Sequence, residues 1–136
     1  MQEWANLALD TARVRGATFA DARVVDIRLR DLSTKNGEVG NLAESESLGL
    51  GLRVIANGCW GFASTDRLTR EGVQACAAYA VSIARASALA KRDDIVMAPE
   101  EAFVDTWQNP FIQDPFEIPL ERQIFLATRT RENRTP

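Results

Sequence analysis

The chain has 136 residues, of which 46% are hydrophobic and 26% are charged. This composition is typical of one globular domain and excludes a disordered or fibrous protein. Acidic residues outnumber basic ones, and the net charge of -3 argues against a protein that coats duplex nucleic acid through phosphate contacts. Histidine is absent, which removes the usual general base at neutral pH and the commonest zinc ligand.

Three segments have the pattern of helices. Apolar residues recur at the helical period over residues 3–15. The longest helix is expected to begin after Thr69, a good N-cap, and to end near Lys91, whose charge suits a helix C-terminus. Pro119 suits the first turn of a last helix over residues 120–130. Small residues line one face of the longest helix and predict close docking on a sheet: Cys76, Ala77, Ala80 and Ala84.

Alternation and turn residues predict strands between the first two helices. Val25, Ile27 and Leu29 alternate with polar residues, which indicates a strand with one apolar face. The dipeptides Asn36-Gly37 and Asn57-Gly58 predict tight hairpin turns. We therefore expect four strands, over residues 21–30, 38–46, 48–54 and 59–63, and a further strand or pair over residues 95–97 and 102–107.

The predicted fold class is α+β, with a mostly antiparallel meander of about four strands packed against one long helix and one or two shorter helices. Residues 1–122 are expected to form the domain. Prolines make residues 109–119 an extended connector whose apolar residues dock on a neighbour. Residues 123–136 are expected to be the start of a connection to a further domain.

Cys59 and Cys76 lack the spacing of a zinc site and are interpreted as buried free thiols in a reducing compartment. The first residues lack the basic segment of a secretory signal. The longest uncharged stretch, residues 72–84, falls short of the roughly 20 residues that span a bilayer. We expect a cytoplasmic protein without a membrane or a nucleic acid as partner.

The residues singled out as candidate substrate or interface contacts are Gly49, Gly51, Arg53, Trp60 and Phe62. The glycines leave one face of their strand nearly bare, which predicts that something packs close to it. The two aromatic residues point the same way and are either core, which we favour, or half of an interface anchor. No residue in the chain is proposed as catalytic or as a metal ligand.

Three arginines offer a second interpretation. Alternation places Arg28 and Arg30 on one side of a strand, and Arg53 could add to a basic face. Such a face would bind a carboxylate or an acidic partner, although the ordinary wet face of a sheet has the same pattern.

The glycine-rich segments, read together, resemble the N-terminal domain of the TldD/PmbA family, whose members are also labelled modulators of DNA gyrase. Residues 49–54 and 58–65 carry most of the resemblance, which extends over residues 16–23, 36–39, 68–71, 106–107 and 114–121. The Asp-Pro-Phe segment at residues 114–116 leans toward the TldD-type subunit rather than its PmbA-type (TldE) partner.

The resemblance implies a zinc-dependent peptidase that degrades or matures small unfolded peptides and pairs with a PmbA/TldE-type subunit or forms a homo-oligomer. In that family an H-E-x-x-x-H motif in a later domain holds the zinc. No position here matches that motif, so this chain alone is expected to be inactive and to hold no cofactor. Its expected role is to wall part of the substrate chamber and to contact other subunits.

Two further expectations accompany this role. The glycine-lined strand over residues 49–53 is a candidate for adding an extended peptide at a sheet edge. The alternative function is a free-standing interaction module that binds a partner such as gyrase and performs no chemistry.

Overall fold

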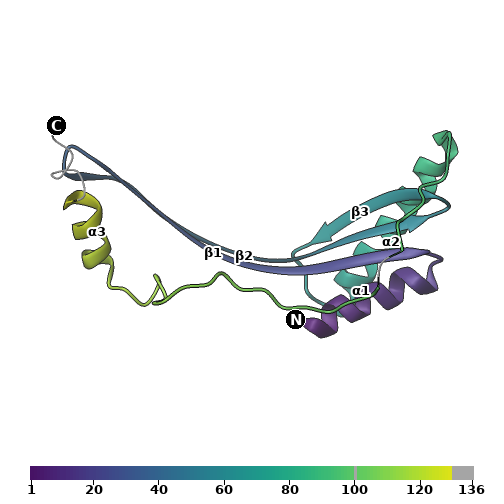
Figure 1. Cartoon of the computed structure of the whole chain (residues 1–136), viewed down its shortest axis with the longest axis horizontal. Helices are drawn as coiled ribbons and strands as arrows, with labels where there is room; N and C mark the ends of the chain where they lie inside the picture. The colour runs from purple at the N-terminus through teal and green to yellow at the C-terminus, as the bar shows by residue number, and fades with distance from the viewer. Residues whose placement is uncertain (100, 130–136) are drawn as a thin grey trace. The chain divides into compact units, whose positions relative to one another are not determined.

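The computed structural model describes residues 1–99 and 101–129. In chain order its elements are helix α1 (Gln2–Val14), strands β1 (Phe19–Lys35), β2 (Glu38–Ala56) and β3 (Cys59–Thr65), helix α2 (Arg70–Ser87), the 3-10 turn η1 (Ala88–Ala90) and helix α3 (Leu120–Arg129) (Figure 1). The α+β class is confirmed, with three antiparallel strands in the order β1-β2-β3. The predicted helix over residues 120–130 is confirmed up to Arg129, and residues 130–136 of the expected connection lie outside the described residues.

Both hairpin turns form where the sequence predicts them. Asn36 and Gly37 have φ values of 55° and 80°, and Asn57 and Gly58 have values of 51° and 72°. A two-residue turn with positive φ at both positions matches the twist of the strands that it joins, and asparagine and glycine tolerate this conformation best. These turns make β1, β2 and β3 a simple meander.

The strand count differs from the expectation of about four. The segments expected as two strands, residues 38–46 and 48–54, are one continuous strand, β2. No turn dipeptide separates them, so nothing in the chain forces a break. Residues 95–97 and 102–107 were expected to add a strand or a pair, but these described residues form none, and Phe103, Val104 and Trp107 are exposed.

The described chain divides into two compact units. Unit 1 contains Met1–Ile27 and residues 46–99, and unit 2 contains Arg28–Ser45 and residues 101–129. Strands β1 and β2 contribute residues to both. The family resemblance and the candidate contacts fall mostly in unit 1. The core of unit 1 therefore supports the candidate site.

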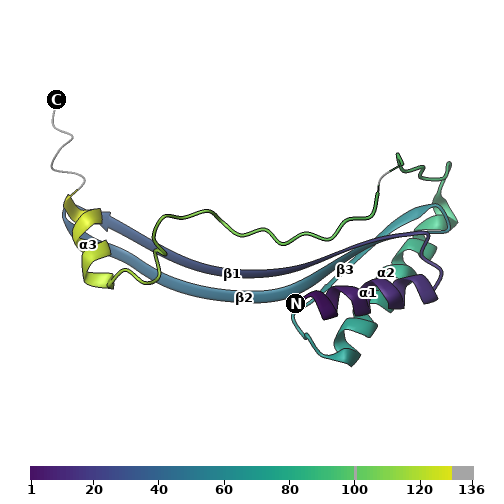
Figure 2. The same ribbon diagram turned by 60° about the horizontal axis from the view of Figure 1, so that its bottom comes forward.

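In unit 1, α1 and α2 pack against the same face of the sheet (Figures 1 and 2). The core joins Leu50, Leu52 and Val54 of β2 to Ala8 and Ala12 of α1 and to the small-residue face of α2. This arrangement confirms the predicted docking of the longest helix. Thr69 caps α2 as expected, since its Oγ1 accepts a hydrogen bond from the Gly72 backbone N–H at 3.1 Å.

Gly61 of β3 sets how closely α2 approaches the sheet. A Cβ atom at this position would lie 2.7 Å from the backbone nitrogen of Ala84 and closer still to the carbonyl oxygen of Ala80. Only a residue without a side chain therefore fits between β3 and the helix. The glycine of β3 is therefore required by the close packing of α2 on this face of the sheet.

By length and composition alone, one described helix, Arg70–Ala90, is long and apolar enough to cross a membrane. Six residues of α2 are buried in the core of unit 1, which is an ordinary place for an apolar helix: Val73, Cys76, Ala77, Ala80, Val81 and Ala84. Packing against the sheet accounts for this composition.

In unit 2, α3 lies beside the turn end of the β1–β2 hairpin (Figure 2). The Thr34 hydroxyl donates a hydrogen bond to the carbonyl of Ala127 at 3.3 Å. The connector before α3 docks only in part as predicted, because Phe116 is half-buried whereas Ile112 is fully exposed.

Candidate functional site

The candidate contacts of the sequence gather on the sheet face of unit 1 that the helices leave open. The register pairs Arg53 with Phe62 and Ile55 with Trp60, whereas their neighbours Leu52 and Val54 point into the core. Residues directly opposite in an antiparallel pair share a face. We call the surface formed by Phe19, Asp21, Arg53, Trp60 and Phe62 the aromatic face.

Trp60 is the centre of this face. Its ring meets the edge of Phe19 at a centroid distance of 5.7 Å with perpendicular planes, a favourable geometry for two aromatic rings. The guanidinium carbon of Arg53 lies 5.0 Å from the Trp60 ring centroid. A cation over an aromatic ring contributes about 0.5–1 kcal/mol at an exposed site. The side chains of three strands therefore hold one another in place.

Asp21 fixes the other end of the Arg53 side chain. Arg53 Nη2 donates to Asp21 Oδ2 at 2.9 Å, and the two side chains are 48% and 26% exposed. At this exposure the ion pair contributes little to stability, because water screens it. The ion pair instead fixes the position of the Arg53 guanidinium above the Trp60 ring.

Phe62 is 59% exposed, so the core interpretation is wrong for this residue. Trp60 is half-buried, and its exposed side belongs to the same open face. The reason is the alternation of β3: Gly61 and Ala63 take the positions under α2 and leave the intervening aromatics on the opposite side. The interpretation of the two rings as an interface anchor stays a prediction.

Phe62 also explains the bare strip on β2. A Cβ atom at Gly51 would lie 3.5 Å from the Phe62 ring, so the ring covers the glycine in ordinary van der Waals contact. A Cβ atom at Gly49 would lie 3.3 Å from the carbonyl oxygen of Thr65. The element packing close to these glycines is thus the neighbouring strand β3.

The same topology leaves no free edge for strand addition at residues 50–53. Over residues 50–56, strand β2 lies between β1 and β3, so its backbone groups there are paired on both sides. The edges of the sheet in unit 1 belong to β1 and β3.

Phe19 and Asp21 were not among the residues that the sequence singled out. The alternation that starts at Asp21 predicts a strand but does not say which neighbour β1 pairs with. Only the meander order, with β1 next to β2, brings Asp21 within reach of Arg53.

The two cysteines are buried and free, as predicted. Burial raises the pKa of the Cys76 thiol, because desolvation disfavours the thiolate. A protonated, buried thiol is a poor nucleophile and a poor metal ligand. Among the described residues, no group of three or more His, Cys, Asp or Glu side chains is placed to hold a metal ion.

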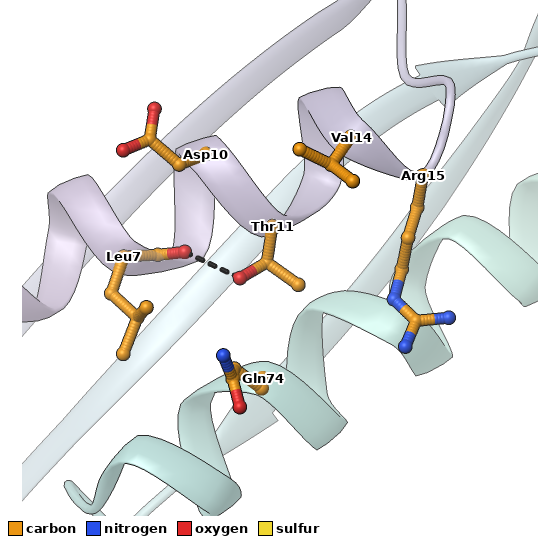
Figure 3. A pocket seen from close by; sticks show the side chains of 6 residues that line it. All are labelled: Leu7, Asp10, Thr11, Val14, Arg15 and Gln74. Atoms are coloured by element: carbon orange, nitrogen blue, oxygen red, sulfur yellow. Dashed lines mark hydrogen bonds between the residues drawn. The ribbon is translucent and has the colours of Figure 1, made fainter.

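A surface hollow of about 610 Å³ lies between α1 and α2 (Figure 3). Its lining is Leu7, Asp10, Thr11, Val14, Arg15 and Gln74. The Thr11 hydroxyl donates to the Leu7 carbonyl at 2.7 Å within its own helix, so it is not aimed at a ligand. This hollow presents no paired acid and base.

Unit 2 contains a second hollow, of about 250 Å³, where Arg28 and Arg30 meet the connector. Their guanidinium carbons lie 4.4 and 5.0 Å from the centroid of the Phe116 ring. Arg30 also donates from Nε to Glu44. The pair of arginines predicted to share a side does so, and its contacts within the unit include an aromatic ring and a carboxylate.

Comparisons with known proteins find a family model that covers most of the three strands and most of α2. A family model described as PmbA/TldA metallopeptidase domain 1 matches residues 20–84. No curated protein matches the chain. Among solved structures, TldE from Thermococcus kodakarensis has a similar fold, with a TM-score of 0.57 and 18% sequence identity.

The similarity to TldE covers 81% of this chain and 23% of the TldE chain, so the sequence spans about a quarter of that protein. At this identity the comparison shows the fold alone. The family match starts within β1 and ends within α2, and so contains β2, β3 and the two aromatic residues of β3. Residues 20–84 of this chain therefore match the first domain of the TldD/PmbA metallopeptidase family.

Proposed function

We propose that this chain supplies the N-terminal, non-catalytic domain of a TldD-like zinc metallopeptidase that degrades or matures small unfolded peptides. The observation that carries the proposal is the match of residues 20–84 to a metallopeptidase domain. The shared fold with TldE supports it.

The donors among the described residues do not fit a catalytic zinc. The sequence has no histidine, and both thiols are buried in unit 1. Zinc in peptidases is held by nitrogen, sulfur or carboxylate donors that converge from at least three residues, and the described residues offer no such group. We therefore propose that the zinc is held outside residues 1–136.

The aromatic face gives this domain its proposed role. A half-exposed cluster of tryptophan, phenylalanine and arginine has the composition of an interface centre, where such residues contribute most of the binding energy. Arg53 is pre-oriented by Asp21, so little side-chain entropy is lost when a surface closes over it. We assign this face to the wall of the substrate chamber and to the contact with a PmbA/TldE-type subunit or a second copy.

The test separates a domain of a peptidase from an interaction module without chemistry. Residues 1–136 are purified alone and together with the zinc-binding part of a TldD-type peptidase, and hydrolysis of a labelled unfolded peptide is measured with and without a chelator. We expect no hydrolysis by the chain alone and chelator-sensitive hydrolysis by the mixture.

Two variants sharpen this experiment. Phe62→Ala removes the exposed ring of the aromatic face and is expected to weaken assembly of the mixture about tenfold, the loss typical of an interface centre. Tyr79→Ala changes an exposed aromatic residue on α2, away from that face, and serves as the control. Hydrolysis by residues 1–136 alone, or a mixture that assembles equally well with both variants, would contradict the proposal.

A further inference from the structure

We propose that the aromatic face binds the C-terminal carboxylate of an unfolded peptide whose last side chain is apolar. This inference rests on the proposed function in taking a peptide as the occupant, and it names the chemical group by which this domain holds the peptide. The groups that carry it are the guanidinium groups of Arg23 and Arg53 and the exposed ring of Phe62.

Two arginines share one carboxylate oxygen on this face. Arg53 Nη2 donates to Asp21 Oδ2 at 2.9 Å, and Arg23 Nη2 donates to the same oxygen at 3.5 Å. Arg23 follows Asp21 by two residues in β1, so both side chains leave the strand on the same side. Within the described residues, the ion pairs of both arginines go to Asp21. Two guanidinium groups and one carboxylate leave an excess of one positive charge here, in a chain whose net charge is -3.

Both guanidinium groups are open to a ligand from solution. The side chains of Arg23 and Arg53 are 75% and 48% exposed. A guanidinium carries five N–H donors in a planar fork, whose geometry matches the two oxygens of a carboxylate. Asp21 and the Trp60 ring already hold the Arg53 guanidinium in place, so little side-chain entropy is lost when a second carboxylate binds. The excess charge therefore favours an anion at an oriented donor group.

An exposed apolar surface lies next to these charges. Phe62 is directly opposite Arg53 in the register of β2 and β3, and it is 59% exposed. Side chains directly opposite each other on one face have Cβ atoms about 4.5–5.5 Å apart. An apolar side chain placed on the Phe62 ring would remove apolar surface from water, which favours binding. The face thus offers a site for a negative charge and a site for an apolar group side by side.

The closeness of the two sites favours a peptide terminus over an acidic side chain. In a C-terminal residue the carboxylate and the side chain are attached to the same Cα atom, so one residue can contact both Arg53 and Phe62. An internal acidic residue would need a second residue for the ring. The next side chain on the same side of an extended peptide is two residues away, roughly 7 Å along the chain. A free C-terminus is also a group that unfolded peptides share whatever their sequence.

The experiment uses residues 1–136 and three soluble probes, followed by chemical shifts of the backbone amides and of the arginine Nε–H groups. The probes are acetyl-Gly-Ser-Gly-Ser-Phe as the free acid, the same peptide as the amide, and acetyl-Gly-Ser-Glu-Ser-Phe-amide, whose single charge is internal. We expect the free acid to shift the Arg53 Nε–H and the Phe62 amide most. It should bind about fivefold more tightly than either amide, which corresponds to the upper end of the range for an exposed ion pair.

Variants of the protein test which side chains hold the carboxylate. Arg53→Gln and Arg23→Gln each remove one positive charge from the site. The matched control is Arg13→Gln, which removes the same charge from another exposed arginine–aspartate pair, on α1. We expect both site variants to reduce the preference for the free acid over the amide to less than about twofold, and Arg13→Gln to leave it unchanged. All three arginine side chains are exposed, so circular dichroism should show the same fold in each variant.

Phe62→Ala tests the apolar half of the site separately. Removing the ring should weaken the free acid and the amide by the same factor, because both probes end in phenylalanine. The preference for the free acid over the amide should therefore stay about fivefold.

Four results would overturn this inference. Two of them are no binding at millimolar probe and equal binding of the free acid and its amide. The third is binding of the internal-acid probe as tightly as the free acid, which would assign the site to acidic side chains. The fourth is dimerisation of the chain that Arg53→Gln abolishes, which would assign the site to a second copy. None of these measurements involves zinc or hydrolysis, so the carboxylate site can fail while the proposed peptidase role stands, and the reverse also holds.

Discussion

Gly61 is the residue on which the packing of unit 1 depends most directly. A methyl group there would overlap the backbone of α2 at Ala80 and Ala84, and backbone cannot rotate out of the way as a side chain can. We predict that Gly61→Ala lowers the free energy of unfolding by about 3 kcal/mol, the upper part of the range for overpacked cores. Urea denaturation measures this change.

Gly51→Ala is the matched control for that prediction. It lies on the neighbouring strand, and its methyl group would meet only the Phe62 ring at 3.5 Å, an ordinary contact. We expect its effect to stay within about 0.5 kcal/mol, as for most surface substitutions. Equal destabilisation by both variants would show that the two glycines matter as strand residues and not through the approach of α2.

Cys76 predicts a pH dependence of stability. Because burial raises the pKa of its thiol in the folded state, the folded state favours the protonated form. The stability from this residue is fully present below the ordinary thiol pKa of 9.0 and is lost as pH rises through the raised value. The free energy of unfolding should therefore fall above about pH 9.

The difference between the wild-type chain and Cys76→Ala isolates this thiol, since other groups titrate equally in both proteins. We expect the stability advantage of the wild type at pH 7 to shrink as the pH is raised through 9 to 11, as measured by chemical denaturation. An advantage that stays constant over this range would contradict the assignment.

At the scale of elements, Phe116 joins the connector to the hairpin in unit 2. Its ring contacts both Arg28 and Arg30, and each such contact contributes about 0.5–1 kcal/mol. We predict that Phe116→Ala speeds amide exchange in α3, because α3 follows directly from the connector that the ring holds. Exchange in α2 should not change.

Phe111→Ala is the control, because Phe111 lies in the same connector and is half-exposed. It should leave exchange in α3 close to that of the wild type. If both variants speed exchange equally, the connector is held by its backbone and the arginine contacts are incidental.

Local signals predicted the elements whose causes are local. The turns at Asn36-Gly37 and Asn57-Gly58 and the cap at Thr69 each depend on a few adjacent residues, and all three are confirmed. The continuity of β2 and the lack of a strand over the described part of residues 95–107 depend on which partners a segment finds. Alternation of apolar and polar residues indicates that a segment is suited to a sheet, but it does not show which strand the segment pairs with.

The apolar face predicted for Val25, Ile27 and Leu29 makes the same point. Their alternation is that of a strand, and β1 forms, yet all three side chains are about half-exposed. Periodicity indicates which residues share a face but cannot show whether anything in the chain covers it.

At the scale of the whole molecule, the candidate site was predicted in part. All five singled-out residues lie in the sheet of unit 1, because their glycines and aromatics occur in two strands joined by one turn. The direction in which their side chains point could be known only from the strand register, which places Gly61 and Ala63 on the core side of β3. The strand order was also needed to show that β1 and β3 are the edges of this sheet.

We proposed that zinc is held outside these 136 residues, and this proposal predicts how the purified chain responds to the metal. A ligand that binds only the folded state at about 100 times its dissociation constant adds about 2.7 kcal/mol of stability. Such a gain shifts the melting temperature by several degrees in a domain of this size. Since the described residues offer no converging set of donors, we expect zinc to leave the melting temperature unchanged or to lower it.

Lowering would arise from the unfolded chain, where the thiols of Cys59 and Cys76 become exposed and bind metal. A variant with both cysteines replaced by alanine separates the two cases, because it should lose any such decrease and show no response to zinc. A rise in melting temperature that a chelator reverses, and that persists in the double variant, would instead place a metal site on the carboxylates of this chain. The proposed assignment of the zinc to another part of the protein would then be wrong.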